Sequence, residues 1–234
     1  MAGNYACPSG DTSGGTGVTT QATDTCACPA GKYTASDGQT SCTDCEEGKY
    51  QGSTGTTVCT AAQQGYFASI SDTAETSAAT GETQVAAGSY ACDAAEGTPD
   101  GVGVTTLASG QCACPAGMYT GSVGQTSCTA CESGKYQGNT ASTECTDVLA
   151  GDYACLTGDT DGTGVTTLAT GTCACPAGYY ANGQGNTECT EVTAGNYACL
   201  SGDSDGTGET SAATASCDCP AGKYTASDLS LIHI

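Results

Sequence analysis

Cysteine is the residue type whose number and spacing could do the most chemistry in this chain. There are 19 cysteines among 234 residues, and several stand in C-x-C or C-x2-C pairs. Zinc sites use such close pairs, but they need four converging ligands, usually with histidine among them, and the chain has a single histidine, His233. Disulfides are dense in small extracellular domains. We therefore expect disulfide bridges, and a cysteine-rich metal-binding protein is an alternative.

Two D-x-D-G segments are candidates for calcium binding, because part of a calcium loop has this pattern. They contribute Asp159 and Asp161, and then Asp203 and Asp205. No glutamate stands where a full calcium loop places its bidentate ligand, and Asp-Gly is also a common hairpin turn. These segments are therefore interpreted either as calcium ligands, calcium being the one candidate cofactor, or as Asp-Gly hairpin turns without a metal.

The charged residues argue against several kinds of partner and activity. The net charge is −21, with four lysines and no arginine. Binding to nucleic acid depends on lysine and arginine, so nucleic acid is not an expected partner. We do not expect an enzyme either, because the carboxylates are scattered through glycine-rich segments instead of gathering with a histidine or an arginine. No apolar run reaches the 18 residues of a membrane span.

The elements that position these residues must hold together without a conventional core. Hydrophobic residues make up 38% of the chain, but most are Ala, Cys and Val, with one Phe and no Trp. Ordering a residue costs roughly 1–2 kcal/mol of backbone entropy, whereas apolar burial returns only about 25 cal/mol per Å². A bridge that closes a loop of about 15 residues contributes about 3 kcal/mol in the chain-entropy model. Bridges are therefore expected to replace the core.

Gly-x-aromatic triplets recur along the chain and define tandem repeats. A short repeat has the pattern C-x2-G-x-Y-x8-C, with cysteines 14 residues apart. Asp37-Gly38 and Asn182-Gly183 lie between such cysteines, and these dipeptides predict a tight two-stranded hairpin. The short-repeat cysteine pairs are Cys28/Cys42, Cys45/Cys59, Cys114/Cys128, Cys131/Cys145 and Cys175/Cys189.

A long repeat has valine at the first cysteine position and places a cysteine two residues after its tyrosine. A second cysteine follows 18 to 20 residues later, after a segment rich in Gly and Asp. The valines are Val85, Val148 and Val192, and the cysteine pairs are Cys7/Cys26, Cys92/Cys112, Cys155/Cys173 and Cys199/Cys217.

The stretch that begins at Ala62 retains Gly65 and Phe67 but has no cysteine. Aligned as a short repeat, it has Ala62 and Thr76 where the two cysteines would stand. Joint loss is expected if the two positions bond to each other, so we predict one bridge inside each repeat. Bridges between neighbouring repeats are the alternative, because sequence alone rarely fixes connectivity.

Both ends of the chain suggest a fragment. Residues 2–7 recur at 194–199, so Met1 stands in mid-repeat, and a secretion signal is expected to have been lost with the missing start. Cys219 opens a short repeat whose second cysteine would be residue 233, which is a histidine. The last six residues, LSLIHI, resemble a translated sequencing-library adapter, so we interpret 229–234 as an artefact.

These patterns predict a small disulfide-rich, mainly β protein. We expect an elongated tandem array of short disulfide-closed hairpins and Gly/Asp-rich loops with little helix, in which each repeat contacts only its neighbours. The tyrosine of a short repeat should cover the adjacent bridge or the next hairpin, and the preceding glycine should allow a positive-φ turn or a close backbone approach. The expected repeats are 1–27 (long, start missing), 28–44 and 45–61 (short), 62–84 (Cys-less), 85–113 (long), 114–130 and 131–147 (short), 148–174 (long), 175–191 (short), 192–218 (long) and 219–228 (truncated short).

The segment CPAGKYTASDGQTSCTDCEEGKY, repeated as CPAGMYTGSVGQTSCTACESGKY, resembles the ephrin-receptor-like cysteine-rich modules of extracellular protist and animal proteins. It is more loosely similar to cysteine-rich surface antigens of ciliates and to tumour necrosis factor receptor repeats. The resemblance covers the short repeats, well under half of the chain. It implies an extracellular β-rich module with local bridges and carries over no catalytic residue. The matching framework positions are Cys28, Cys42, Cys45, Gly31 and Tyr33.

The expected function is that of a structural protein at the cell surface or outside the cell, in a coat, stalk or filament such as a protist surface or flagellar hair. Expected partners are the protein itself or other extracellular repeat proteins, with O-linked glycans on Thr and Ser. A ligand-binding receptor or adhesin ectodomain is the alternative. Near-identical repeats favour the structural role, because a binding site usually needs one repeat to differ, and 62–84 is the candidate for such a repeat.

Overall fold

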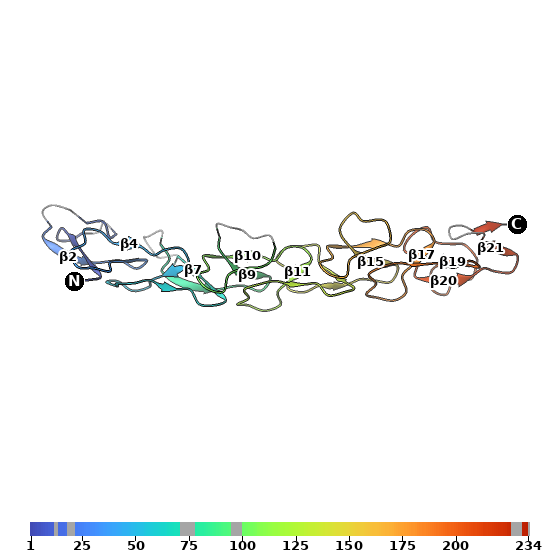
Figure 1. The fold of residues 1–234 in the computed structure, drawn as a ribbon, viewed down its shortest axis with the longest axis horizontal. Helices are drawn as coiled ribbons and strands as arrows, with labels where there is room; N and C mark the ends of the chain where they lie inside the picture. The colour runs from blue at the N-terminus through green and yellow to red at the C-terminus, as the bar shows by residue number, and fades with distance from the viewer. Residues whose placement is uncertain (12–13, 18–21, 71–77, 95–99, 226–230, 234) are drawn as a thin grey trace. The chain divides into compact units, whose positions relative to one another are not determined.

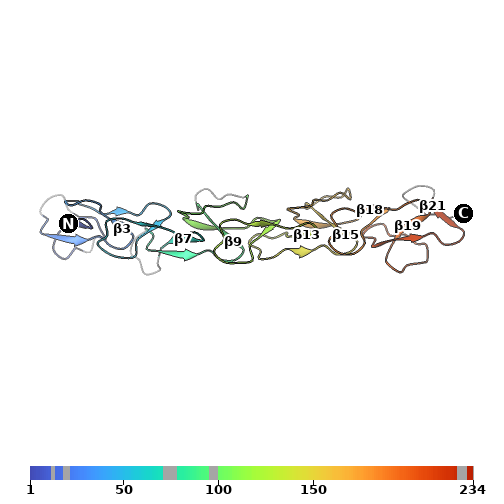
Figure 2. The ribbon, with the colours of Figure 1, turned by 60° about the horizontal axis from the view of Figure 1, so that its bottom comes forward.

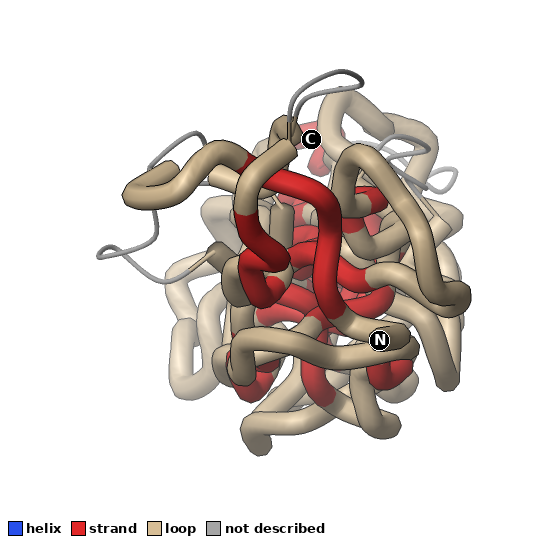
Figure 3. Tube along the Cα trace, turned by 90° about the vertical axis from the view of Figure 1, so that its left-hand side faces the viewer, coloured by secondary structure: helices blue, strands red, loops and turns tan. Residues whose placement is uncertain are grey.

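A computed structural model presents the protein as a succession of short antiparallel hairpins (Figure 1). It describes residues 1–234 except 12–13, 18–21, 71–77, 95–99, 226–230 and 234. The 22 strands assigned in this part pair two by two, each with its neighbour in the sequence. The described residues contain no helix (Figure 3), and so none that is long and apolar enough to cross a membrane. The prediction of a small disulfide-rich, mainly β fold is confirmed.

The chain divides into two compact lobes, which we describe separately. Lobe 1 comprises Met1–Ala113 with Ser122–Cys128, and lobe 2 comprises Cys114–Gly121 with Thr129–Ile234. The same two kinds of hairpin, short and long, occur in both lobes (Figure 2).

The short hairpins have strands of only two residues. In the first, β3 (Lys32–Tyr33) pairs with β4 (Thr43–Asp44), so residues 34–42 form the connection. Asp37 and Gly38 form a turn, as predicted, and Gly38 has a positive φ of 76°, but this turn lies within the longer loop and does not connect the two strands directly. The loop does not continue the ladder because its carbonyls accept hydrogen bonds from the preceding long repeat. The other short hairpins are β5 (Lys49–Tyr50) with β6 (Thr60–Ala61), β11 (Met118–Tyr119) with β12 (Thr129–Ala130), β13 (Lys135–Tyr136) with β14 (Thr146–Asp147), and β17 (Tyr179–Tyr180) with β18 (Thr190–Glu191).

The long hairpins have strands of four residues, and their register places the tyrosine opposite the second cysteine. Tyr153 lies opposite Cys173, for example, and the cysteine that bonds to Cys173 ends the first strand. The long hairpins are β1 (Asn4–Cys7) with β2 (Asp24–Ala27), β9 (Ser89–Cys92) with β10 (Gly110–Ala113), β15 (Asp152–Cys155) with β16 (Gly171–Ala174), and β19 (Asn196–Cys199) with β20 (Ala215–Asp218). At the end of the chain, β21 (Lys223–Thr225) pairs with β22 (Leu231–His233).

The repeat without cysteine is a long hairpin, and its alignment as a short repeat was wrong. In it, β7 (Tyr66–Ser69) pairs with β8 (Gly81–Gln84), with Phe67 opposite Thr83 as tyrosine is opposite cysteine elsewhere. Ser69 and Thr83 therefore occupy the bridge positions, and the Thr83 hydroxyl donates a hydrogen bond of 2.8 Å to the Ser69 hydroxyl. Ala62 instead occupies the buried first position of the repeat, where other long repeats have valine. Thr76 lies outside the described residues.

We expect the double substitution Ser69→Cys/Thr83→Cys to form a bridge and to stabilise this hairpin by about 1–2 kcal/mol, somewhat below the chain-entropy value because engineered bridges often distort local geometry. Amide exchange in residues 66–69 and 81–84 should slow by about tenfold. The single variant Ser69→Cys, which cannot form the bridge, is the control. Equal exchange rates in the oxidised and reduced double variant would contradict the assignment.

Eight bridges join cysteines of one repeat, with Cα–Cα distances of 5.7–6.0 Å. Of the two alternatives that the spacing left open, the structure therefore contains the within-repeat one. Cys114 and Cys128 are also disulfide-bonded, and Cys219 is a free thiol. In every close pair except Cys217/Cys219 both cysteines are disulfide-bonded, and in that pair only Cys219 is free, so no close pair offers two thiolates to a metal. The eight bridges are Cys7–Cys26, Cys28–Cys42, Cys45–Cys59, Cys92–Cys112, Cys131–Cys145, Cys155–Cys173, Cys175–Cys189 and Cys199–Cys217.

Backbone hydrogen bonds join successive repeats. At every repeat junction that lies within one lobe, the first residue of a repeat donates its N–H to the carbonyl of the preceding Gly-x-aromatic glycine, at 2.8–3.0 Å. Cys175 bonds to Gly151 in this way, and Ala212 of the following repeat then donates to the Cys175 carbonyl at 3.0 Å. The Gly151 backbone also lies against the Ala212 carbonyl, two repeats further along the chain. The expectation that repeats contact only their neighbours is therefore wrong.

Two kinds of small apolar cluster take the place of a continuous core. Where a long repeat follows, the aromatic side chain of the preceding repeat packs on a buried valine and two buried alanines, as Tyr136 does on Val148, Ala154 and Ala169. Where a short repeat follows a long one, the tyrosine of the long repeat packs against sulfur. Tyr153 lies with Cys155 and Cys175, from two different bridges. The tyrosine predicted to cover the adjacent bridge or the next hairpin is that of the short repeats, and Tyr136 confirms the second of these, because it packs on the repeat that follows.

Candidate functional site

The D-x-D-G segments form turns in which the carboxylates accept backbone hydrogen bonds. Asp159 accepts from the amide of Asp161 at 3.3 Å, and Asp161 accepts from the amide of Thr163 at 2.7 Å. The second segment repeats these bonds at Asp203 and Asp205, which accept from the amides of Asp205 and Thr207 at 3.1 and 2.6 Å. The Thr207 amide holds the pKa of Asp205 below its usual value. Each of the four aspartates thus accepts a backbone hydrogen bond within its own segment, and calcium binding there stays a prediction.

In the part of the chain that the structure describes, one group of three side chains has the spacing of metal ligands. It consists of Cys7, Asp11 and Cys26, whose ligand atoms lie within 4.8 Å of one another. Cys7 and Cys26 are bonded to each other, so their sulfurs are not thiolates. Asp11 accepts a hydrogen bond of 2.9 Å from the Tyr5 hydroxyl. This group holds the loop to the tyrosine and does not provide a metal site.

The tyrosine hydroxyl of the long repeats is a fixed anchor for the Asp-Gly loop. Tyr153 is fully buried, and its hydroxyl accepts a hydrogen bond of 3.1 Å from the Gly162 amide. The Gly162 carbonyl in turn accepts from the Cys189 amide at 3.0 Å, so the loop is held between its own hairpin and the next repeat. Burial raises the pKa of Tyr153, because the phenolate would lose its hydration.

This burial predicts a loss of stability at alkaline pH. The folded pKa of Tyr153 is above the unfolded value of about 10, so the unfolded chain releases the proton first. The stability that depends on the neutral phenol is therefore present below about pH 10 and lost as pH rises through the folded pKa. Ultraviolet titration of the tyrosines should show one fewer late-ionising group in Tyr153→Phe. An unchanged late phase in that variant would rule out this assignment.

Two equivalent surface pockets lie where one short repeat follows another. Pocket A, in lobe 1, has a volume of about 60 Å³ and is lined by Tyr33, Glu46, Lys49, Val58 and Cys59. Pocket B, in lobe 2, has a volume of about 200 Å³ and is lined by Tyr119, Glu132, Lys135, Glu144 and Cys145. Each tyrosine comes from the first short repeat of the junction and the other residues come from the second. The repeat architecture thus builds the same kind of site in each lobe.

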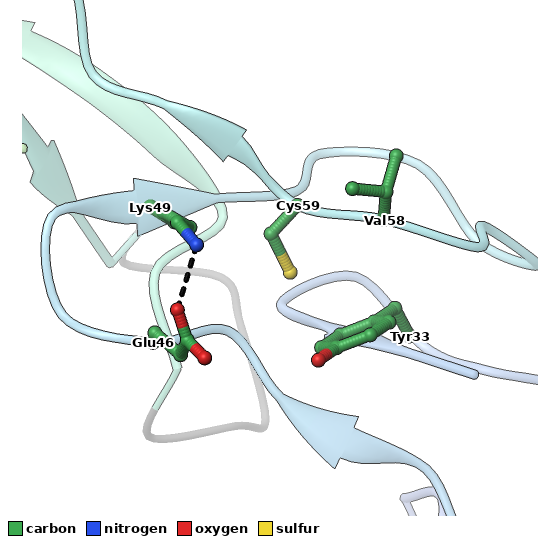
Figure 4. A pocket seen from close by; sticks show the side chains of 5 residues that line it. All are labelled: Tyr33, Glu46, Lys49, Val58 and Cys59. Carbon is green, nitrogen blue, oxygen red and sulfur yellow. Dashed lines mark hydrogen bonds and ion pairs between the residues drawn. The ribbon is translucent and has the colours of Figure 1, made fainter. Parts of the chain in front are cut away.

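Pocket A combines an aromatic ring, a bridge sulfur and an ion pair. Figure 4 shows the Lys49 ammonium directed at Glu46, with the Cys59 sulfur between this pair and the Tyr33 ring. The Lys49–Glu46 distance is 2.6 Å, and the hydrogen bond lowers the pKa of Glu46 and raises that of Lys49. The two charges offset each other, so pocket A is close to neutral.

Pocket B has the same tyrosine and bridge but a different ion pair. Lys135 bonds to Asp147 at 3.1 Å, and this contact is the main cause of the raised pKa of Lys135. Glu144 stands in pocket B where Val58 stands in pocket A. Pocket B therefore carries two glutamates beside one lysine that is already bonded elsewhere.

Neither pocket contains a predicted site residue other than bridge cysteines. The glutamates and lysines of the short–short junctions are ordinary surface residues in sequence, and their pattern alone does not predict a pocket. An alignment of 45–61 with 131–147 would have exposed the signal, because Glu47/Ser133, Val58/Glu144 and Ala61/Asp147 are charge differences within otherwise very similar segments.

No known protein-family profile matches the chain, and no curated protein is significantly similar to it. The likeness to ephrin-receptor-like modules therefore stays a resemblance carried by the short repeats.

Proposed function

We propose that this chain is part of a structural extracellular repeat protein that works in a cell-surface coat, stalk or filament. The observation that carries the proposal is the recurrence of one backbone hydrogen bond, from the first residue of each repeat to the glycine before it, at every junction within a lobe. Such a bond joins repeats without depending on side chains, so the same connection can be repeated along a long array.

The bridges support an extracellular setting for this role. Disulfides form and persist in oxidising environments and are rare in the cytosol. Eighteen of the cysteines are bonded, so a metal-thiolate function has no free ligand set among them. Each of the eight described pairings closes a loop of 14 to 20 residues, which limits how far any one repeat can extend.

Immunogold electron microscopy on cells of the source organism tests the proposal. Antibodies raised against the oxidised chain should label continuous surface layers or fibres, and extraction of the antigen should increase when a reductant is added. Label confined to the cytoplasm, or an antigen released as a soluble monomer without reductant, would overturn the structural role.

A further inference from the structure

The two short–short junctions are built alike, and one of the positions at which they differ lies across the hairpin from the pocket lysine. In pocket A, Lys49 lies across the hairpin from Ala61, which cannot pair with it, and the ammonium turns to Glu46. In pocket B, Lys135 lies across from Asp147 and bonds to it. Lys49 is therefore paired with the pocket glutamate, whereas Lys135 is paired with an aspartate outside the pocket lining.

Because Lys135 is paired with Asp147, Glu132 lacks the ion pair that Glu46 makes in pocket A. Within the described part of the chain, Glu132 has no salt bridge, whereas Glu46 has one of 2.6 Å. Glu132 and Glu144 are both exposed, and each still lines pocket B together with the Tyr119 ring. The pocket thus offers two carboxylates and the Tyr119 ring beside one ammonium, that of Lys135, which hydrogen-bonds to Asp147 and is also within the electrostatic reach of Glu132.

These groups are those that recognise an organic cation. An ammonium or guanidinium ion is attracted by the face of a tyrosine ring, and more strongly where carboxylates stand beside it. Pocket B is also the larger of the two, at about 200 Å³ against about 60 Å³. The chain as a whole carries a charge of −21, which favours the approach of a cation.

We propose that pocket B binds a primary ammonium or guanidinium group between Tyr119, Glu132 and Glu144, and that pocket A does not. This site goes beyond the structural role and does not depend on it, because a coat or filament protein and a receptor could equally carry it. The relevant ligands are a small organic cation or a lysine or arginine side chain of a partner protein.

Nuclear magnetic resonance titration of the oxidised, ¹⁵N-labelled chain with arginine amide tests the proposal. Saturable shifts are expected at the amides around Tyr119, Glu132 and Glu144, weakening as salt is added. The α-amino group of the ligand is acetylated, so that the guanidinium carries its only charge, and citrulline amide acetylated in the same way has nearly the same shape without that charge. It should bind about tenfold more weakly or not at all. Equal binding of the two amides would overturn the proposal.

Variants that exchange residues between the pockets provide matched controls. Glu144→Val/Asp147→Ala gives pocket B the residues of pocket A, and we expect it to weaken arginine amide binding by about tenfold. Val58→Glu/Ala61→Asp should create binding at pocket A. Each introduced residue already occupies the same place in a folded copy of the repeat, so both variants should fold. Unchanged affinity at pocket B in the first variant, or shifts of the same size at pocket A and pocket B in the unsubstituted chain, would contradict the site.

A second titration distinguishes the two sources of the cation. If the tripeptide Gly-Arg-Gly binds pocket B more tightly than arginine amide, the flanking backbone contributes and the site suits a partner's side chain. If the two bind equally, the site suits a small cation. Binding of neither ligand would overturn the proposal.

Discussion

Replacement of both Cys155 and Cys173 by alanine is expected to lower the stability of the 148–174 repeat by about 3 kcal/mol. The bridge closes a loop with a sequence separation of 18, and Cys155 is fully buried against Tyr153. Amide exchange at residues 152–155 and 171–174 should therefore become about a hundredfold faster, since each 1.4 kcal/mol is a factor of ten. Hydrogen–deuterium exchange is the suitable measurement, because a repeat array does not unfold in a single transition.

The Cys-less repeat supplies the control for this experiment. Cys155→Ser/Cys173→Thr copies the natural pair Ser69 and Thr83, whose hydroxyls are 2.8 Å apart. It should lose the bridge but recover about 0.5–1.5 kcal/mol through the hydrogen bond. If both double variants exchange at the rate of the unsubstituted chain, the bridge does not stabilise the repeat.

Substitution of Gly151 by alanine is expected to destabilise lobe 2 by about 2–4 kcal/mol. Gly151 is buried with a φ of 90°, where a Cβ costs about 1 kcal/mol. That Cβ would also overlap the backbone carbonyl of Ala212, which cannot move as a flexible side chain would, and such crowding typically costs about 1–3 kcal/mol more. Amide exchange across 151–155 and 175–181 reports the effect.

Gly158→Ala separates the two costs of the Gly151 substitution. Gly158 has a φ of 99°, but nothing lies within 4 Å of the position of its Cβ, so only the backbone cost of about 1 kcal/mol is expected. Equal losses in Gly151→Ala and Gly158→Ala would show that the contact between second-neighbour repeats carries no energy.

The features that were predicted correctly are those with a local cause. A constant separation of 14 residues places Cys28 and Cys42 in one small hairpin, so a bridge inside the repeat needs no knowledge of the rest of the chain. Glycine before tyrosine indicated a positive φ or a close approach, and Gly151 has both.

The features that were missed depend on contacts that leave little trace in the sequence. The bond from Ala212 to the Cys175 carbonyl uses only backbone atoms, so almost any residue type is compatible with it. The Cys-less repeat was misaligned because Ala62 was compared with cysteine, although the informative pair was Ser69 and Thr83. The turn at Asp37-Gly38 lies in a longer loop than the dipeptide indicated, and that loop bonds to the preceding repeat.

Disulfide mapping of the unreduced chain tests the central claim, which is that each repeat is closed by its own bridge and joined to the next by its backbone. Digestion with pepsin suits a chain with four lysines and no arginine, and the acidic pH suppresses exchange because the thiolate is the attacking species. The account predicts linked peptides that contain Cys7 with Cys26, Cys155 with Cys173, and the other within-repeat pairs. Peptides linked between different repeats, or unoxidised cysteines throughout, would contradict it.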